Sequence, residues 1–319
     1  MEYLLLKEIQ RMLSRNDLVG SWAGLPVAWK EDWSFDEATY RSDLERACKA
    51  GVPGVYTGGS TGEFHAMEFD EWKAVSRATV EVCKACGTPV MLGVTSTYTL
   101  GSQRRAAHAL ELGADAVQLA VPFWLEIKAN EITPFFRQVA DACPGLAVTI
   151  YDTQRAKHSI TIDEHRAIKE AVPAYLAVKA NAGTVGSTPE GCEVLSEFIN
   201  VWVNENKWAE LGPHGAVGCA SALVYMNPRI ILEIQGHLLA KRWDEVKRWC
   251  QFLDDYHVGL APFTERGFED TAYDHLQGTV TGFLKMHPRS RGPYISATEE
   301  DVVAFRKWLE ANAPEMLVL

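Results

Sequence analysis

The chain has 319 residues, of which 47% are hydrophobic, and its formal net charge at pH 7 is −11. This length suits one large α/β barrel or two ordinary domains, and the apolar fraction suffices for a sizeable core. The acidic balance, without a basic cluster interleaved with aromatics, argues against nucleic acid or an anionic membrane as a partner. No apolar stretch approaches the roughly 18 residues that a membrane span requires.

The first 17 residues are expected to form an amphipathic helix ahead of the main fold. Leucines and an isoleucine alternate there with charged residues. A signal peptide would instead need an uninterrupted apolar centre and a small-residue cleavage site. The sequence therefore predicts a cytoplasmic protein.

The seven cysteines are scattered along the chain. Cys83 and Cys86 form the only CxxC pair, and no second pair completes a zinc site. The sequence also lacks HxH, HExxH and phosphate-loop motifs. We therefore expect neither a metal site nor a cofactor.

From Leu18 onward, strand-like and helix-like runs alternate. The predicted strands cover 18–29 with its exit loop, 54–58, 89–94, 116–121, 146–151, the run around Lys179, 198–203 and 215–220. Predicted helices at 35–50, 68–86, 100–112, 131–142 and 162–171 separate them. Eight short βα units favour an α/β protein with a parallel (β/α)8 TIM barrel over residues 18–228. Helical patterns at 230–239, 243–256, 270–286 and 299–313 predict a C-terminal helical extension over 229–319.

One lysine stands at the end of a strand pattern that is apolar on both faces. Leu176, Ala177 and Val178 suit a buried strand, and Lys179 follows them. Burial is costly for a cation and favours the neutral, nucleophilic amine that a Schiff base requires. In isolation, a lysine that reaches solvent or pairs with a surface carboxylate is the commoner arrangement.

Groups at other strand ends favour a catalytic lysine over a solvated one, because the catalytic groups of such barrels lie at the carboxyl ends of the strands. The second strand ends in Gly-Gly-Ser-Thr-Gly-Glu, where the hydroxyls and backbone N–H groups of Ser60 and Thr61 can hold a carboxylate. The fifth strand ends at Tyr151, whose phenol can move a proton beside Lys179. Taken alone, the segment with Ser60 and Thr61 has an ordinary flexible loop as its alternative, and Tyr151 has a tyrosine of the barrel core as its alternative.

Taken together and in this order, the motifs resemble the N-acetylneuraminate lyase and dihydrodipicolinate synthase superfamily of class I, Schiff-base-forming pyruvate aldolases and lyases. The glycine-rich run 215–221 resembles the family's eighth strand, and residues 291–293 resemble its Arg-x-Pro segment. The resemblance implies that Lys179 forms an imine with pyruvate or a longer 2-oxo acid. It also implies that Ser60 and Thr61 bind the carboxylate, that Tyr151 and Ser60 relay protons, and that Gly218 leaves room for the keto acid.

The chain departs from the dihydrodipicolinate-forming members after the fourth strand. Those members carry Pro-Tyr-Tyr where this chain has Pro-Phe-Trp, and an indole cannot replace the second tyrosine in a proton relay. The run resembles the hydratase-aldolase branch of the family instead. There, Phe123 and Trp124, together with Trp22, would form an apolar wall for a hydrophobic acceptor.

A second departure concerns the arginine after the fifth strand. It lies at Arg155, four residues past Tyr151 where the synthase members have five, and Lys157 and His158 follow it. Arg155 is a candidate substrate-binding residue, but its role and those of Lys157 and His158 stay open at this stage.

The sequence thus predicts a carbon–carbon lyase that acts on a small-molecule 2-oxo acid, and the resemblance implies a homotetramer built as a dimer of dimers. A Schiff-base dehydratase, hydratase or deaminase of a 2-oxo acid is the first alternative. A non-catalytic barrel that binds a keto acid is the second, since a fold does not define an activity. The acceptor and the reaction direction stay open.

Overall fold

The computed structural model describes residues 12–319, and its eight parallel strands close into a barrel. Each strand pairs with the next in chain order, and β8 pairs with β1. The strands are β1 (Gly20–Gly24), β2 (Val55–Thr57), β3 (Val90–Gly93), β4 (Ala116–Leu119), β5 (Ala147–Asp152), β6 (Tyr175–Ala180), β7 (Asn200–Trp202) and β8 (Ala216–Ser221). This topology confirms the predicted (β/α)8 barrel.

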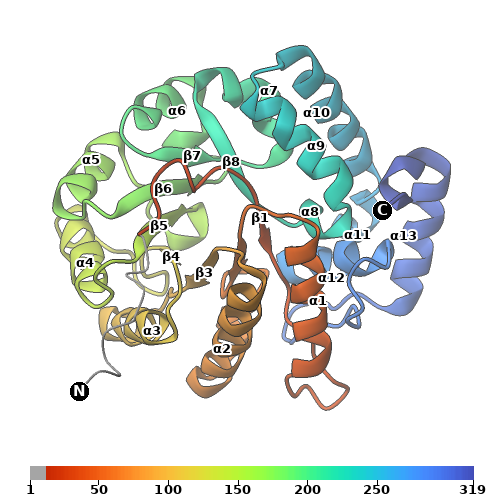
Figure 1. The fold of residues 1–319 in the computed structure, drawn as a ribbon, viewed down its shortest axis with the longest axis horizontal. Coiled ribbons are helices and arrows are strands. Elements are labelled where there is room, and N and C mark those ends of the chain that lie inside the picture. Colours follow the sequence, from red (N-terminus) through yellow and green to blue (C-terminus); the bar gives the residue numbers. More distant parts are fainter. Residues whose placement is uncertain (1–11) are drawn as a thin grey trace.

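Helices surround the ring of strands, as Figure 1 shows. Those of the barrel are α1 (Glu37–Lys49), α2 (Phe69–Cys86), α3 (Thr99–Leu112), α4 (Ala129–Asp141), α5 (Ile162–Ala171), α6 (Pro189–Ser196), α7 (Trp208–Leu211), α8 (Leu223–Met226) and α9 (Pro228–Leu239). The C-terminal part adds α10 (Trp243–Val258), α11 (Ala261–Glu265), α12 (Asp270–Val280) and α13 (Glu299–Asn312).

The barrel interior below its carboxyl end is filled with side chains. A cluster of buried residues from all around the ring occupies it: Leu18, Trp22, Tyr56, Met91, Ala116, Ala147, Leu176, Ala177 and Trp202. Trp22 and Trp202 pack with their ring centroids 5.7 Å apart, and the Trp202 indole donates to the carbonyl of Leu18 at 3.0 Å. Burial of such large rings stabilises the barrel.

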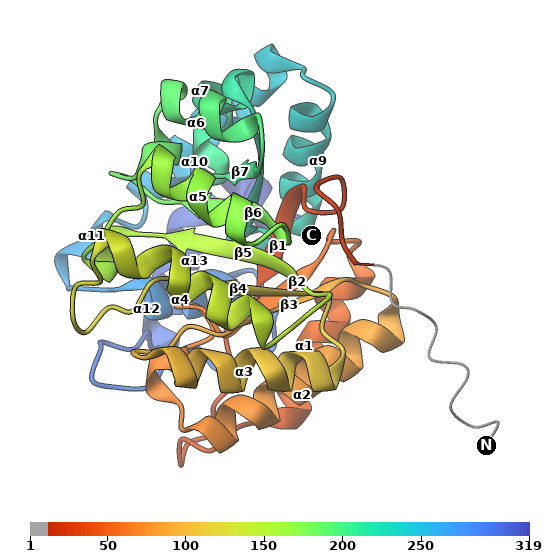
Figure 2. The same cartoon turned by 90° about the vertical axis from the view of Figure 1, so that its left-hand side faces the viewer.

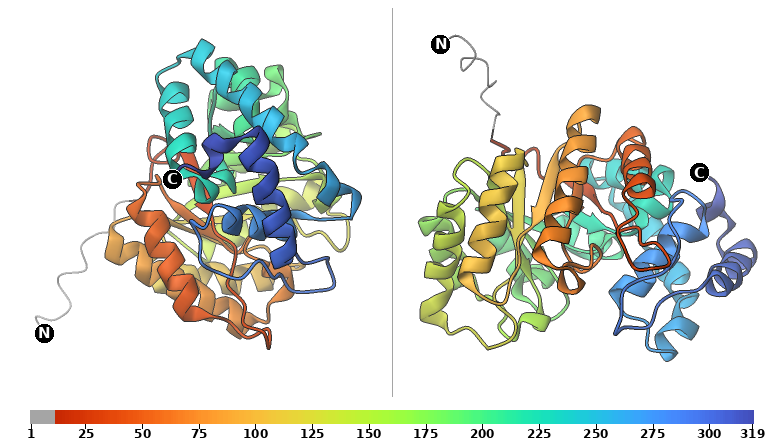
Figure 3. Two further views of the ribbon diagram at one scale, coloured as in Figure 1. Left: turned by 90° about the vertical axis from the view of Figure 1, so that its right-hand side faces the viewer. Right: turned by 90° about the horizontal axis from the view of Figure 1, so that it is seen from below.

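The C-terminal extension packs against one side of the barrel. In Figure 3 its helices, in blue, lie together next to α1. The Asp43 carboxylate of α1 accepts hydrogen bonds from the backbone N–H groups of Lys285 and Met286 at 2.8–3.0 Å. Figure 2 shows that β5 points toward the side where α11 and α12 lie. The extension therefore reaches the carboxyl end of the barrel.

Two of the expected helices differ in the structure. Residues 1–11 of the expected N-terminal helix lie outside the described residues, and residues 15–17 form a turn rather than a helix. The helix expected over 270–286 ends at Val280, because Gly282 follows with a positive φ of 76°. The domain boundary expected at residue 229 stays a prediction; it falls at the start of α9, whose Gln235 side-chain oxygen accepts a hydrogen bond from the backbone N–H of Ser21 in β1 at 2.8 Å.

Candidate active site

Lys179 and Tyr151 are cross-strand neighbours at the carboxyl ends of β6 and β5. The Lys179 Nζ lies 4.5 Å from the centroid of the Tyr151 ring, and both side chains line a pocket at the barrel mouth. The Tyr151 hydroxyl accepts a hydrogen bond from Nδ2 of Asn181 at 2.8 Å. Since a phenol that accepts still holds its own proton, the Tyr151 hydroxyl can donate into the pocket.

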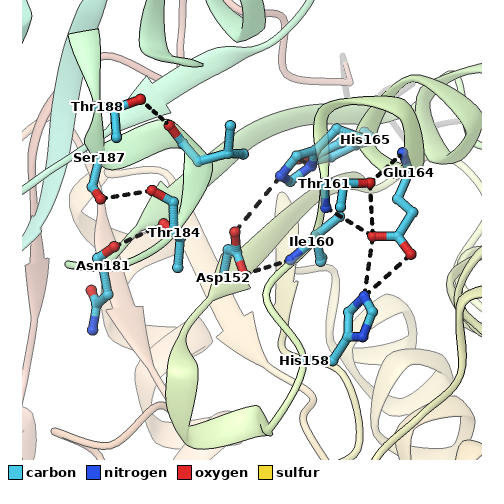
Figure 4. Close-up of polar contacts among 12 residues, drawn as sticks. Asp152, His158, Ile160, Thr161, Glu164, His165, Asn181, Thr184, Ser187 and Thr188 are labelled. Atoms are coloured by element: carbon cyan, nitrogen blue, oxygen red, sulfur yellow. Dashed lines mark hydrogen bonds and ion pairs between the residues drawn. The ribbon is translucent and has the colours of Figure 1, made fainter. Parts of the chain in front are cut away.

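Hydrogen bonds fix the loops that follow these two strands (Figure 4). Asp152, next to Tyr151, accepts from the backbone N–H of Ile160 at 3.2 Å, and its other oxygen lies 3.8 Å from Nε2 of His165. After β6, Thr184 donates to the carbonyl of Asn181 at 2.8 Å, and Ser187 donates to that of Thr184 at 2.7 Å. These bonds hold Tyr151 and Asn181 on fixed backbone.

The Lys179 amine has acidic neighbours. Burial by itself lowers the pKa of Lys179, but nearby acidic groups, led by Tyr151, outweigh burial and raise it above its ordinary value. The others are Cys219, Asp270 and Asp274. The sequence predicted that burial would favour the neutral amine. Burial does favour the neutral amine, but the acidic groups that surround the buried amine favour the ammonium more strongly.

The loop after β2 contains the predicted carboxylate cradle and is anchored by Glu63. Ser60 lines a pocket beside Tyr151, and Thr61 lies in the pocket of Lys179. Glu63 is fully buried in the left-handed conformation, at φ 51°. Its carboxylate accepts from the Trp29 indole and the backbone N–H of Arg291, both at 2.7 Å. Such uncommon backbone persists only where the surroundings over-determine it.

Helix α12 brings three side chains to the loops of the barrel mouth. Nε2 of His275 lies 3.0 Å from Oε1 of Glu63. Asp274 accepts from the Thr61 hydroxyl at 2.5 Å. Asp270 accepts from both terminal nitrogens of Arg155, at 2.6 and 3.0 Å. The C-terminal extension therefore contributes directly to the site, which the sequence reasoning did not find.

The mouth contains two pockets that share Tyr151 and Asp270. The first has a volume of about 550 Å³ and a largely polar lining that includes Lys179, Asn181, Asn204, Asn206 and Gln277. The second, of about 200 Å³, is lined by the aromatic side chains of Phe64, His65, Phe123, Tyr294 and Tyr56 together with polar residues. We call them the lysine pocket and the aromatic pocket. The first falls within the usual size range of small-molecule sites.

The structure corrects the roles expected for three residues. A Cβ on Gly218 would lie 2.6 Å from the Trp202 indole nitrogen, so this glycine makes room for Trp202 and not for a ligand. Trp22 is fully buried in the barrel interior and does not reach the mouth. The Trp124 side chain is 72% exposed and lines neither pocket, whereas Phe123 lines the aromatic one.

The basic residues whose roles were left open now have partners. Arg155 pairs with Asp270, as described above. Lys157 donates from Nζ to the carbonyl of Trp124 at 2.7 Å. Nε2 of His158 lies 3.1 Å from the Glu164 carboxylate, which belongs to the capping box that begins α5. Lys157 and His158 therefore lie outside both pockets.

The cysteine pair lies away from the mouth, at the end of α2. Cys83 contacts Cys48 with their sulfur atoms 4.0 Å apart, and Cys86 is exposed. Within residues 12–319, no group of three or more His, Cys, Asp or Glu side chains is placed to hold a metal ion. In the same part of the chain, no helix combines the length and apolar character that crossing a membrane requires.

The sequence carried a signal for one of the residues that were missed. Asn181 lies two positions after Lys179, and residues two apart on a strand project from the same face. Asp270 and Asp274 are one helical turn apart, which places both on one face of α12. Nothing in the sequence indicates, however, that this face covers the barrel mouth.

A TIM barrel with a lysine and a tyrosine side by side at the carboxyl ends of adjacent strands has the architecture of a class I lyase. The sequence matches the Dihydrodipicolinate synthetase family over residues 17–257. The chain belongs to this family and is an enzyme of the lyase (aldolase) type.

The similarity extends over nearly the whole chain. It is 27% identical over 282 residues to the 4-hydroxy-tetrahydrodipicolinate synthase of Agrobacterium fabrum, covering 88% of this chain and 93% of that one. Among solved structures, PhdJ bound to a substrate intermediate superposes with a TM-score of 0.83 at 24% identity, covering 95% and 98% of the two chains. A catalytic lysine mutant of the Ruminococcus gnavus sialic acid aldolase gives 0.82 at 17% identity, covering 96% and 97%.

Proposed function

We propose that this enzyme forms an imine between Lys179 and pyruvate or a longer 2-oxo acid, and makes or breaks a carbon–carbon bond in the attached substrate. The observation that carries the proposal is the placement of Lys179 over the Tyr151 ring, in a pocket that Thr61 also lines. A binding barrel without chemistry has no need of this nucleophile and phenol side by side.

The first step attaches the substrate. The Lys179 ammonium loses a proton, the neutral amine adds to the keto carbon, and the carbinolamine hydroxyl takes up a proton and leaves as water. The product is a protonated imine, so the Lys179 nitrogen carries one positive charge both before and after this step. Ser60 and Thr61 bind the substrate carboxylate through their hydroxyls and backbone N–H groups.

The second step uses the imine as an electron sink. In the cleavage direction, the Tyr151 oxygen accepts the proton of the hydroxyl on C4 while its own phenolic proton passes to solvent at the barrel mouth, the C3–C4 bond breaks, and its electron pair forms an enamine with the iminium carbon. The aldehyde leaves, the enamine takes a proton at C3, and hydrolysis releases pyruvate. The hydrogen bond from Asn181 keeps the Tyr151 hydroxyl oriented for this transfer.

We further propose that the aldehyde half is apolar, which would place the enzyme near the hydratase-aldolase branch of the family. The aromatic pocket adjoins Tyr151 and presents the rings of Phe64 and Phe123, which meet edge to face with their centroids 6.1 Å apart. A planar aldehyde can pack against such rings. The Arg155 guanidinium is paired with Asp270, so a second carboxylate, which aspartate semialdehyde carries, lacks a free cation there.

A second candidate is a Schiff-base dehydratase, hydratase or deaminase that acts on a hydroxylated 2-oxo acid. The observation in its favour is the polar lining of the lysine pocket by Asn204, Asn206 and Gln277. Product analysis separates the candidates, because only aldol cleavage releases both pyruvate and a free aldehyde.

The deciding experiment is borohydride reduction in the presence of pyruvate, followed by mass spectrometry of the peptides. We expect one stable adduct, located at Lys179. Matched controls are the Lys157→Met variant, which should still form the adduct, and Lys179→Met, which should not. An adduct-free wild-type protein would contradict the imine mechanism and would favour the non-catalytic barrel.

We also propose a homotetramer assembled as a dimer of dimers. The loop after β4 exposes two large apolar side chains in sequence, Trp124 at 72% and Leu125 at 77%. Exposed apolar groups of this size often mark contact surfaces. Sedimentation at micromolar concentration should show a tetramer, and a purely monomeric profile would contradict the proposal.

A further inference from the structure

Asp274 is a buried carboxyl group that the catalytic steps above do not use. It is only 7% exposed, comes from α12 of the C-terminal extension, and lines the lysine pocket. Its Oδ2 accepts a hydrogen bond from the Thr61 hydroxyl at 2.5 Å. The carboxyl group therefore contacts the residue that is proposed to bind the substrate carboxylate.

This contact conflicts with substrate binding as long as Asp274 is ionised. A hydroxyl has one proton, and the Thr61 hydroxyl that donates to Asp274 cannot also donate to the substrate. Two carboxylates on either side of one hydroxyl also repel each other. A hydroxyl oxygen can accept a hydrogen bond, however, so a protonated Asp274 would remove both difficulties at once.

The surroundings of Asp274 make protonation accessible near neutral pH. Burial, followed by the charge of Asp270, raises the pKa of Asp274 to about 7, against the opposing effects of the Thr61 hydrogen bond, Lys179 and His275. The titratable groups that face it come from four elements: Asp270 and His275 on α12, Lys179 on β6, Tyr225 on α8 and Tyr256 on α10. Loss of the Thr61 bond to an arriving substrate would raise this pKa further.

We propose that Asp274 is a positioning residue that takes up one proton when a 2-oxo acid binds, and then donates a hydrogen bond to the Thr61 oxygen. The hydrogen bond between the two side chains reverses, and the Thr61 hydroxyl proton turns toward the substrate carboxylate. The proton comes from solvent, and no covalent bond other than its O–H bond forms in this step. This inference rests on the proposed function, because it requires a keto acid in the cradle.

The proton balance of imine formation makes the uptake measurable. Lys179 begins as an ammonium and ends as a protonated imine, with water as the only other product, so this step takes up no net proton. A proton consumed on pyruvate binding between pH 7 and 9 is therefore assigned to Asp274. The sign follows from linkage: a ligand that raises a carboxyl pKa binds more weakly as pH rises through the free-state value.

The test is calorimetry of pyruvate binding to the wild-type enzyme in two buffers of different ionisation enthalpy. At pH 8 we expect uptake of close to one proton, and uptake near zero at pH 5.5. The dissociation constant should rise about tenfold or more from pH 7 to pH 9. The Asp274→Asn variant, whose amide can donate to Thr61 permanently, should take up no proton and bind with little dependence on pH.

Asp270→Asn is the matched control, because Asp270 lies one turn away on α12 but pairs with Arg155 instead of Thr61. It should retain the uptake, with the transition moved to lower pH by the loss of a negative neighbour. An adduct at Lys179 without proton uptake overturns this inference alone, as does uptake that persists in Asp274→Asn. Failure of borohydride to trap pyruvate at Lys179 overturns the proposed function and this inference together. The wild-type measurement decides even if a variant does not fold.

Discussion

The lysine pocket and the aromatic pocket meet at the same barrel mouth and share Tyr151 and Asp270, yet they have opposite chemistry. The first gathers charged groups around an amine, whereas the second presents several aromatic rings, although Ser60, Arg155 and Glu269 also line it. Residues of barrel strands and of α12 line both pockets, and the second also includes Tyr294 from the segment before α13. This division suggests that imine chemistry and acceptor choice are set by different side chains, and variants can separate them.

The largest effect is expected from removing the nucleophile in the lysine pocket. Lys179→Met should reduce turnover by at least about 10⁴-fold, because no other amine lines the pocket in the described part of the chain. The unfolding midpoint should stay close to that of the wild type, since Asp270 is 41% exposed and the buried Asp274 can become protonated once the neighbouring cation is lost. Turnover assays and thermal unfolding together check this prediction. Substantial residual turnover would contradict it.

The next effect concerns the group that both pockets share. Tyr151→Phe removes the proton carrier but keeps the ring, so turnover should fall by about 10²–10⁴-fold while the imine still forms. Borohydride trapping measures the imine independently of turnover. The exposed Tyr98 offers a matched control, because Tyr98→Phe should change neither quantity. Loss of the adduct in Tyr151→Phe would show that the tyrosine acts before the carbon–carbon step.

A smaller effect should distinguish the two pockets as acceptor sites. Phe123→Ala should lower kcat/KM for an aromatic aldehyde by about tenfold, with pyruvate as the common donor. Asn204→Ala should instead lower it for a hydroxylated aldehyde. Equal losses of kcat/KM for both aldehydes in either variant would contradict the assignment of different acceptors to the two pockets. The wild type should also prefer the aromatic aldehyde to aspartate semialdehyde, and the reverse preference would contradict an apolar acceptor.

The smallest effect is expected at the ion pair between the pockets. The Arg155 and Asp270 side chains are 52% and 41% exposed, so Arg155→Met should change the free energy of unfolding by no more than about 1 kcal/mol. Because Arg155 is already paired, the variant should not lose activity toward aspartate semialdehyde relative to the wild type. Denaturant unfolding and a condensation assay check the two statements. A selective loss with the semialdehyde would assign Arg155 to substrate binding.

Strand ends were the part of the site that the sequence could predict. Alternating strand and helix patterns placed Lys179, Tyr151 and the Ser60–Thr61 loop at the carboxyl ends of strands, where parallel topology brings them to one mouth. The structure confirms this barrel and shows Lys179 beside Tyr151. The local sequence pattern suffices to place these residues, because a parallel strand buried on both faces can pair with its neighbours in few registers.

The sequence did not predict the contacts between segments that lie far apart in the chain. The glycine-rich eighth strand suggested space for a ligand at Gly218, but the space is filled by Trp202 from the neighbouring strand. Pro-Phe-Trp suggested an apolar wall, but only Phe123 faces the pocket while Trp124 points to solvent. Side-chain direction in a loop depends on its backbone turns, which no periodicity encodes.

By itself the sequence determined the (β/α)8 fold and placed the proposed nucleophile, the phenol and the loop proposed to hold a carboxylate, because each belongs to a strand end with its own local signal. Only the tertiary structure decided what surrounds them. Helix α12, which begins ninety-one residues after Lys179 in the chain, delivers Asp274 to Thr61 and Asp270 to Arg155. These carboxylates help to raise the pKa of the Lys179 amine that burial alone would lower. Electrostatic interactions depend on distance in space, and the local pattern of residues does not specify that distance.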